Sequence, residues 1–426
     1  MITILLVAIF VLGYLAITLE HPLKVNKASS ALITGVACWA IYILSSVEHA
    51  PVTHQLEEHL GSISGILFFL MGAMVVVELI DAHDGFDIIT GLIRTTNKRQ
   101  LLWILSVITF IFSAILDNLT TTIVMISLQK KLIEDREDRL LFAGMTVIAA
   151  NAGGAWSPIG DVTTTMLWIG GQITAANIIK MLILPSIACL LLPLVVLSLQ
   201  IKGSITGPKK TGNAPLTSTR FERNSVFAAG ITMLVLVPVF KTVTHLPPFM
   251  GMLLGLGLLW LITEVIHSGK DEAEKGILSV NHAIRKIDTP SILFFLGILL
   301  AISALESTGI LNSLAAWLNT NIGNVTLIGL FLGFLSAVVD NVPLVAATQG
   351  MYSLQDYPMD DFFWELLAYC TGVGGSALII GSAAGVAAMG LEKIDFFWYL
   401  RKISFLAILG YLSGAGVYLL QHHITQ

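Results

Sequence analysis

The sequence contains few charged residues for a chain of its length. Only 12% of its 426 residues are Asp, Glu, Lys or Arg, whereas 55% are hydrophobic. Soluble domains carry about 25% charged residues, which they need to cover their surface, so the composition excludes that class. The composition predicts instead an integral membrane protein whose first partner is the lipid bilayer.

Cysteine is also scarce. The three cysteines, Cys38, Cys189 and Cys370, all fall in apolar segments without Cys-x-x-Cys spacing, which argues against disulfides and cysteine metal centres. No cofactor and no nucleic-acid partner is expected.

No basic segment precedes the apolar residues 2–18, so they are expected to remain as a helix rather than act as a signal peptide.

Long apolar runs are frequent. About 20 apolar residues in a helix cross a hydrocarbon layer of about 30 Å, and several runs approach or reach that length. These runs lie near residues 2–18, 28–46, 61–80, 178–199, 225–243, 249–267 and 397–420. A transmembrane β-barrel would show short segments of alternating polarity instead. The predicted fold class is therefore an all-α polytopic membrane protein.

Basic residues predict how the chain is oriented. All but two of the 23 Lys and Arg residues fall into six groups, at 24–27, 94–99, 130–139, 202–223, 270–286 and 393–402. Lys and Arg favour loops on the cytoplasmic side, so these groups are expected there. The loops at 45–60, 307–321 and 351–362 contain neither residue and are expected to be external.

Two apolar stretches are expected to enter the membrane without crossing it. Residues 101–129 lie between two basic loops and are too short for two crossings at 1.5 Å per residue. They predict a re-entrant helical hairpin that turns near Asp117 and Asn118. Residues 322–350 lie between two external loops and predict a second hairpin that enters from the opposite side.

The two halves of the chain repeat each other. Ser-Ala-Ile-Leu-Asp-Asn at 113–118 returns as Ser-Ala-Val-Val-Asp-Asn at 336–341, and the Gly pair at 153–154 returns at 374–375. A nearly constant offset predicts an internal repeat, and the charge rule places the two copies in opposite orientations. The predicted organisation is N-terminal helices at 1–60, a first inverted repeat at 61–199, a cytoplasmic linker at 200–224, connecting helices and a loop at 225–289, and a second inverted repeat at 290–426.

Ionisable residues within apolar sequence are the main candidates for function. A carboxylate at membrane depth costs at least a few kcal/mol and usually marks an ion or substrate path, which applies to Asp117 and Asp340. Each half also contains a Gly-rich segment, 151–165 and 372–385, that predicts a broken transmembrane helix. Unwound backbone frees carbonyl oxygens that suit hard cations.

Each candidate also has a purely structural interpretation. Asp117, Asp340 and Asp161 can each cap a following helix, but Asn caps about as well without the cost of a buried charge. Glu78, Asp81, His83 and Asp84 end the third span, where solvated helix ends are the simpler interpretation. The same holds for Glu264 and Glu306.

At these residues the sequence resembles the NhaD-type sodium/proton antiporters of the ion transporter superfamily, over about residues 61–420. The resemblance is carried by Glu-Leu-Ile-Asp-Ala-His at 78–83, Asp-Asn-Leu-Thr-Thr at 117–121, the string 151–161, Asp-Asn-Val-Pro at 340–343, and the Gly-rich strings 374–378 and 381–385. It implies exchange of cytoplasmic Na⁺ or Li⁺ for external protons by alternating access, a homodimer, and Asp117, Asn118, Asp340 and Asn341 as site residues. A bacterial inner membrane is the expected location.

Competition for a carboxylate gives the expected mechanism. Burial disfavours the charged form, so such a group holds a proton until a cation binds beside it. Asp117 and Asp340 are the predicted carriers of Na⁺ and proton, with Asp161 as a third. The neutral groups expected to bind the cation or support the hairpins are those of Asn118, Asn341, Asn151, Ser157 and Thr120, and the accessory candidates are Glu78, Asp81 and His83.

Two other functions were considered. An arsenite or carboxylate transporter of the same superfamily is the nearest alternative, but an organic dianion would favour basic groups, and neither hairpin contains Lys or Arg within its apolar arms. An intramembrane aspartyl protease also uses two membrane Asp residues. That class requires a Gly-x-Gly-Asp element, whereas Gly160-Asp161 follows Pro-Ile.

Overall fold

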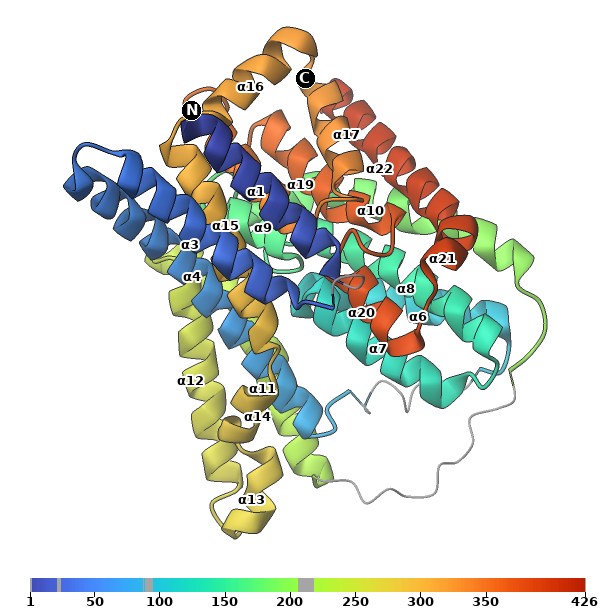
Figure 1. Cartoon of the computed structure of the whole chain (residues 1–426). Coiled ribbons are helices and arrows are strands. Elements are labelled where there is room, and N and C mark those ends of the chain that lie inside the picture. Colours follow the sequence, from blue (N-terminus) through green and yellow to red (C-terminus); the bar gives the residue numbers. More distant parts are fainter. Residues whose placement is uncertain (1, 21–23, 87, 89–94, 206–217, 426) are drawn as a thin grey trace.

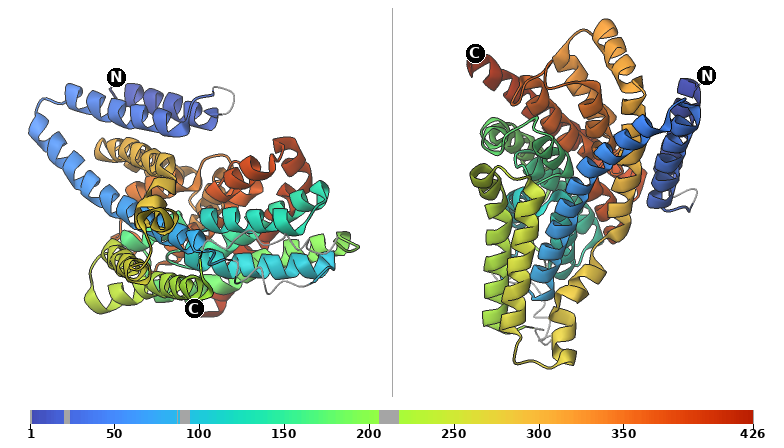
Figure 2. Two further views of the ribbon diagram at one scale, coloured as in Figure 1. Left: turned by 90° about the horizontal axis from the view of Figure 1, so that it is seen from below. Right: turned by 90° about the vertical axis from the view of Figure 1, so that its left-hand side faces the viewer.

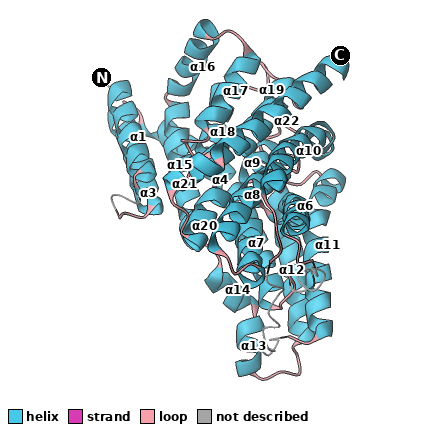
Figure 3. Ribbon diagram, turned by 90° about the vertical axis from the view of Figure 1, so that its right-hand side faces the viewer, coloured by secondary structure: helices cyan, strands magenta, loops and turns pink. Residues whose placement is uncertain are grey.

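The computed structural model describes residues 2–20, 24–86, 88, 95–205 and 218–425 (Figure 1). The described residues are mainly helical and form no strand beyond one isolated bridge between Asn97 and Ser204 (Figure 3). Residues 206–217, about half of the predicted linker 200–224, lie outside the described residues, as does Arg94 of the basic group 94–99. The predicted all-α polytopic class is confirmed.

The helices follow one another in two similar series. The first half contains α1 (Ile2–Thr18), α3 (Lys27–Ser45), α4 (His49–Ala82), α6 (Lys98–Leu116), α7 (Asn118–Leu132), α8 (Arg136–Ala155), α9 (Val162–Ile169) and α10 (Ala175–Gln200). Between the halves lie α11 (Arg220–Thr244), α12 (Pro248–Ile266), α13 (Glu272–Leu278) and α14 (Val280–Lys286). The second half contains α15 (Thr289–Ser307), α16 (Ile310–Asn321), α17 (Val325–Leu335), α18 (Asn341–Met351), α19 (Phe362–Gly374), the 3₁₀ turn η1 (Gly375–Ala377), α20 (Ala383–Glu392), α21 (Phe396–Lys402) and α22 (Ser404–Thr425).

Eight of the described helices are long and apolar enough to cross a membrane: α3, α4, α6, α10, α11, α12, α15 and α22. Two of them, α6 and α15, were not among the predicted apolar runs. The run predicted at 397–420 divides instead into α21 and α22, because the helix ends after Arg401 and Lys402 and restarts at Ser404. Helix α1, with 17 residues, is slightly shorter than a full span.

The chain breaks where the two hairpins and the two broken helices were predicted. Helices α6 and α7 meet at Asp117, whose φ of 90° ends one helix while its side chain caps the next. The first hairpin is longer than predicted, since α6 begins at Lys98 and α7 ends at Leu132. In the second half, residues 336–340 separate α17 from α18. Residues 156–161 separate α8 from α9, and residues 375–382 separate α19 from α20.

Equivalent close contacts pack the broken helix of each half against the first helix of its hairpin. A Cβ added to Gly153 would lie 2.2 Å from the carbonyl oxygen of Phe110, and one added to Gly374 would lie 2.0 Å from that of Gly333. Glycine is therefore required for α8 to approach α6 and for α19 to approach α17. A serine hydroxyl repeats as well: Ser113 donates to Ala150 O at 2.5 Å, and Ser336 donates to Thr371 O at 2.9 Å.

These elements form a central group with other helices beside it. Helices α7, α8, α9, α18, α19 and α20 contact one another in the centre, whereas α1 and α3 form a pair at one edge and pack on α15 (Figure 2). Helices α11 and α12 pack on α4. Large apolar side chains such as Leu254, Leu258 and Leu261 of α12 are exposed, as expected for a surface that faces lipid.

The glycine contacts give a first prediction. Replacing Gly153 or Gly374 by Ala places a methyl group against a backbone oxygen and should destabilise the protein by about 1–3 kcal/mol, because the backbone has to shift. The expected result is a lower Tm of the purified protein in detergent. Gly416→Ala in α22 is the matched control, since its added Cβ meets nothing within 4 Å. Equal Tm values for all three variants would contradict the proposed close packing.

Candidate functional site

Asp161 lies at the centre of a buried polar network. It caps α9, and its Oδ1 accepts bonds from Thr163 N–H at 2.8 Å and from the Thr163 hydroxyl at 2.7 Å. Asn118 donates from Nδ2 to Oδ2 of Asp161 at 2.5 Å, and Nδ2 of Asn341 lies 3.4 Å and 3.5 Å from its two oxygens. Asp161, Asn118 and Asn341 are only 1%, 3% and 4% exposed. Neutral donors from both halves thus surround one buried carboxylate.

Asn151 joins this network to the second broken helix. Its Oδ1 accepts a bond from Asn118 at 3.0 Å, and its Nδ2 donates to Ser376 at 2.8 Å and to Ser382 at 2.9 Å. Ser382 caps α20 in the way that Asp161 caps α9. The network therefore runs continuously from the first half of the chain to the second.

Asp117 and Asp340 take a different position from Asp161. Asp117 accepts bonds from the backbone N–H and the hydroxyl of Thr120, both at 2.8 Å, and so caps α7. Asp340 caps α18 by accepting from Val342 N–H at 3.2 Å, while its own N–H donates to the Tyr14 hydroxyl at 2.9 Å. Each is next in sequence to an asparagine, Asn118 or Asn341, that approaches Asp161. The three predicted acidic residues thus share one region, with Asp161 at its centre.

Thr120 donates its hydroxyl to the carboxylate of Asp117, and Ser157 supports the backbone. The Ser157 hydroxyl donates to Ala114 O at 2.6 Å and fixes the non-helical segment 156–161 against α6.

At the far end of α9, Lys241 donates to Trp168 O at 2.6 Å and complements the negative end of the helix. Short α9 is therefore held at both ends.

Helix ends of both kinds meet around the network. Helices α7, α9, α18 and α20 begin there, and helices α6, α8, α17 and α19 end there. Carbonyl groups at helix C-termini carry partial negative charge that favours cations. Among the described residues, no three His, Cys, Asp or Glu side chains are placed to hold a metal ion together. A cation beside Asp161 would therefore depend on amide, hydroxyl and carbonyl oxygens.

Two of the accessory candidates lie elsewhere. Glu78 pairs with Lys286 of α14 at 3.1 Å. His83 is fully buried, bonds to Leu79 O at 2.7 Å and stacks on His267 with ring centroids 5.1 Å apart. Burial lowers the pKa of His83, so its ring stays neutral at pH 7. These contacts place Glu78 and His83 beside α14 and α12, while Asp81 belongs to the same end of α4.

Sequence reasoning missed three members of the network. Thr163, Ser376 and Ser382 were not predicted as site residues, although they bond to Asp161 or Asn151. The repeat offset pairs Asp161 with Ser382 and would have indicated that position. Ser376 corresponds to an alanine in the first half, so no signal in the sequence marks it.

The connecting role of Asn151 can be tested. Asn151→Ala removes the partner shared by Asn118, Ser376 and Ser382 and should cost about 1–3 kcal/mol for each buried polar group left unsatisfied. A lower Tm than that of the native protein is expected. Asn312→Ala, on the exposed face of α16, is the control and should leave the Tm unchanged. A Tm loss no larger than that of the control would show that the network does not join the halves.

Comparisons with known proteins find similar sequences among membrane transporters. Residues 2–374 match the family model CitMHS, described as citrate transporter. Sodium/proton antiporter 1 of Arabidopsis thaliana is 49% identical over 98% of this chain and 72% of its own length, and sodium/proton antiporter 2 of the same plant is 47% identical over 97% and 99%. The Na⁺/H⁺ antiporter NhaD of Vibrio cholerae is 31% identical over 97% of this chain and 91% of its own length. The chain therefore belongs to the citrate transporter family of membrane transporters, within the group of NhaD-type sodium/proton antiporters.

Proposed function

We propose that this protein exchanges cytoplasmic Na⁺ or Li⁺ for external protons, and that the carboxylate of Asp161 holds cation and proton in turn. The observation that carries the proposal is the position of Asp161, buried between asparagines from both halves of the chain. Its hydrogen-bond donors within the described residues are neutral. A buried carboxylate with neutral partners needs either a cation or a proton to offset its charge.

Exchange follows from competition at this group. When Asp161 is ionised, a cation beside it replaces the water that burial removed, and when the cation leaves, a proton restores neutrality. Asn118 and Asn341 support both states, because an amide carries donors on nitrogen and an acceptor oxygen. Turning the amide presents oxygen to a cation, and turning it back presents N–H to the carboxylate.

Asp117 and Asp340 would contribute negative charge around this centre. Each adjoins an asparagine that approaches Asp161, so three carboxylates in one region would repel one another and favour a cation or a proton there. We propose that they link proton release to cation binding, as the sequence suggested, while Asp161 takes the central position. Ser157 then acts through the backbone that it fixes, and Thr120 acts through the carboxylate of Asp117, to which its hydroxyl donates.

Alternating access would use the two halves as inverted repeats. The recurring glycine and serine contacts support this interpretation, since each half positions its broken helix in the same way. Each repeat would supply one asparagine to a shared site, which opens to opposite sides as the repeats move. We further propose that the protein forms a homodimer. We expect it in a membrane that maintains a proton gradient, such as a bacterial inner membrane. The relatives include plant and bacterial proteins.

Transport of an organic anion such as citrate is the second candidate, with arsenite as the related alternative. The match of residues 2–374 to the citrate transporter model favours it. A polycarboxylate would have to bind beside Asp161, however, and the resulting repulsion argues against this substrate. Uptake of labelled citrate by the same vesicles, without a response to Na⁺, would favour the second candidate.

The test of the proposal is Na⁺-triggered proton movement in acid-loaded proteoliposomes. The native protein should release protons when Na⁺ or Li⁺ is added. Asp161→Asn keeps a side chain that can cap α9 but removes the charge, so exchange should fall to the level of empty vesicles. Asp117→Asn and Asp340→Asn should each lower the rate at least several-fold.

Asp395→Asn provides a matched control. Asp395 caps α21 as Asp161 caps α9, but it lies exposed and outside the network. Its variant should exchange at the native rate. Full exchange by Asp161→Asn would remove that residue from the mechanism, and full exchange by both Asp117→Asn and Asp340→Asn would remove the other two.

A further inference from the structure

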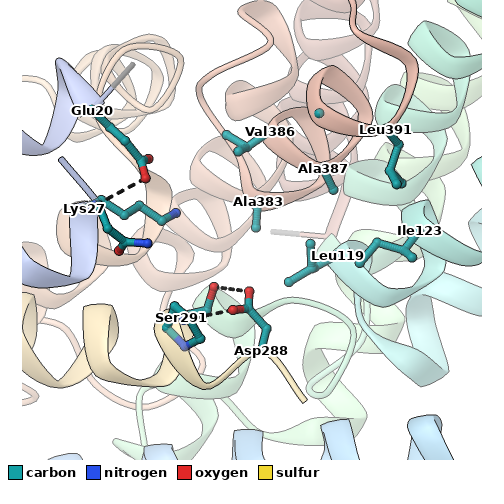
Figure 4. Close-up of a pocket in the computed structure, with 13 residues that line it drawn as sticks. Glu20, Lys27, Leu119, Ile123, Asp288, Ser291, Ala383, Val386, Ala387 and Leu391 are labelled. Carbon is teal, nitrogen blue, oxygen red and sulfur yellow. Dashed lines mark hydrogen bonds between the residues drawn. The ribbon is translucent and has the colours of Figure 1, made fainter. Parts of the chain in front are cut away.

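A cavity of about 400 Å³ is lined by residues that adjoin members of the Asp161 network in the sequence (Figure 4). One wall is formed by α7 and α20, where Leu119 follows Asn118 and Ala383 follows Ser382. The opposite wall is formed by the start of α15 and by Glu20, Asn26 and Lys27. Residues next to two members of the network thus form the inner end of the cavity.

Polar side chains lie on the wall opposite α7 and α20. Asp288 caps α15, accepts a bond from Ser291 N–H at 3.2 Å and contacts the Ser291 hydroxyl. Glu20 accepts a bond from the backbone N–H of Lys27 at 3.3 Å. The Lys27 ammonium lies over the Phe294 ring, 4.5 Å from its centroid. With two carboxylates and one ammonium, this wall carries an excess of negative charge.

One end of the cavity lies beside segments of the chain that are predicted to be cytoplasmic. Lys27 belongs to the basic group 24–27, and Asp288 follows the group 270–286. On the other wall, α20 ends against the group 130–139, since Lys130 donates to Leu391 O at 2.7 Å and Arg139 pairs with Glu392 at 3.3 Å. Three predicted cytoplasmic segments therefore surround its outer end.

We infer that this cavity is the cytoplasmic passage by which a hydrated alkali cation reaches the Asp161 network, and that Asp288 attracts the cation into it. The inference rests on the proposed exchange function for the identity of the ion. A water molecule takes about 30 Å³, so the cavity holds on the order of ten waters, enough for a cation with its first hydration shell. The carboxylates of Glu20 and Asp288 outnumber the Lys27 ammonium on this wall, and their net negative charge raises the local cation concentration.

Water access is tested with cysteine variants. Ala383→Cys and Ala387→Cys place a thiol in the inner part of the cavity, and Gly390→Cys places one at its outer end, where an added Cβ meets nothing within 4 Å. A charged, membrane-impermeant thiol reagent added to the cytoplasmic face of oriented vesicles should modify all three. The native cysteines are buried, which keeps the background low.

Gly257→Cys is the matched control, because Gly257 also lies within a helix with open space around it, but on exposed α12. It should react slowly, since the reagent does not enter lipid. Na⁺ should slow modification at Ala383→Cys and leave Gly390→Cys unaffected. Lack of reaction at both Ala383→Cys and Ala387→Cys, in vesicles that exchange Na⁺ for protons, would overturn the passage while the proposed function stands.

The role of Asp288 is tested by kinetics. Asp288→Asn retains the cap of α15 and should raise the KM for cytoplasmic Na⁺ several-fold without changing the maximal rate. Asp395→Asn should change neither value. An unchanged KM in Asp288→Asn would overturn the role of this carboxylate. If the native protein shows no Na⁺ response but Ala383→Cys is protected by citrate, the proposed function fails and the passage serves an anion instead.

Discussion

The burial of one carboxylate between two halves of the chain is the constraint on which this structure depends. Asp161 is held by Thr163 of its own helix, by Asn118 at the start of α7 and by Asn341 at the start of α18. Losing any of these donors leaves a buried carboxylate oxygen with fewer hydrogen bonds, which costs free energy because burial has removed its water. The four breaks in the helices are arranged so that short polar side chains can reach this point.

Close backbone contact makes that arrangement possible. Gly153 lies against Phe110 O, and Gly374 lies against Gly333 O, so each broken helix sits directly on the arm of its hairpin. Because the contacts are so short, tertiary packing positions the non-helical segments, and the local conformational preference of their backbone does not. Helix ends that would be costly in hydrocarbon are acceptable here because they are buried in protein.

Several features could be predicted from sequence because they depend on local pattern. Long apolar runs gave the polytopic class, the duplicated Ser-Ala-x-x-Asp-Asn string gave the breaks near residues 117 and 340, and the paired glycines gave the breaks after α8 and α19. The length of the first hairpin and the division between α21 and α22 were wrong or incomplete. Helix ends depend on capping and on neighbouring helices, which hydropathy does not report.

The sequence by itself determined which residues are expensive to bury, since an Asp or Asn within apolar sequence is visible without a structure. It also determined the repeat, because the offset between the halves is a property of the order of residues. Only the tertiary structure decided that Asp161 lies at the centre, with Asp117 and Asp340 capping helices beside it. It alone brought in Ser376, because a hydrogen bond across 225 residues depends on how the two halves pack.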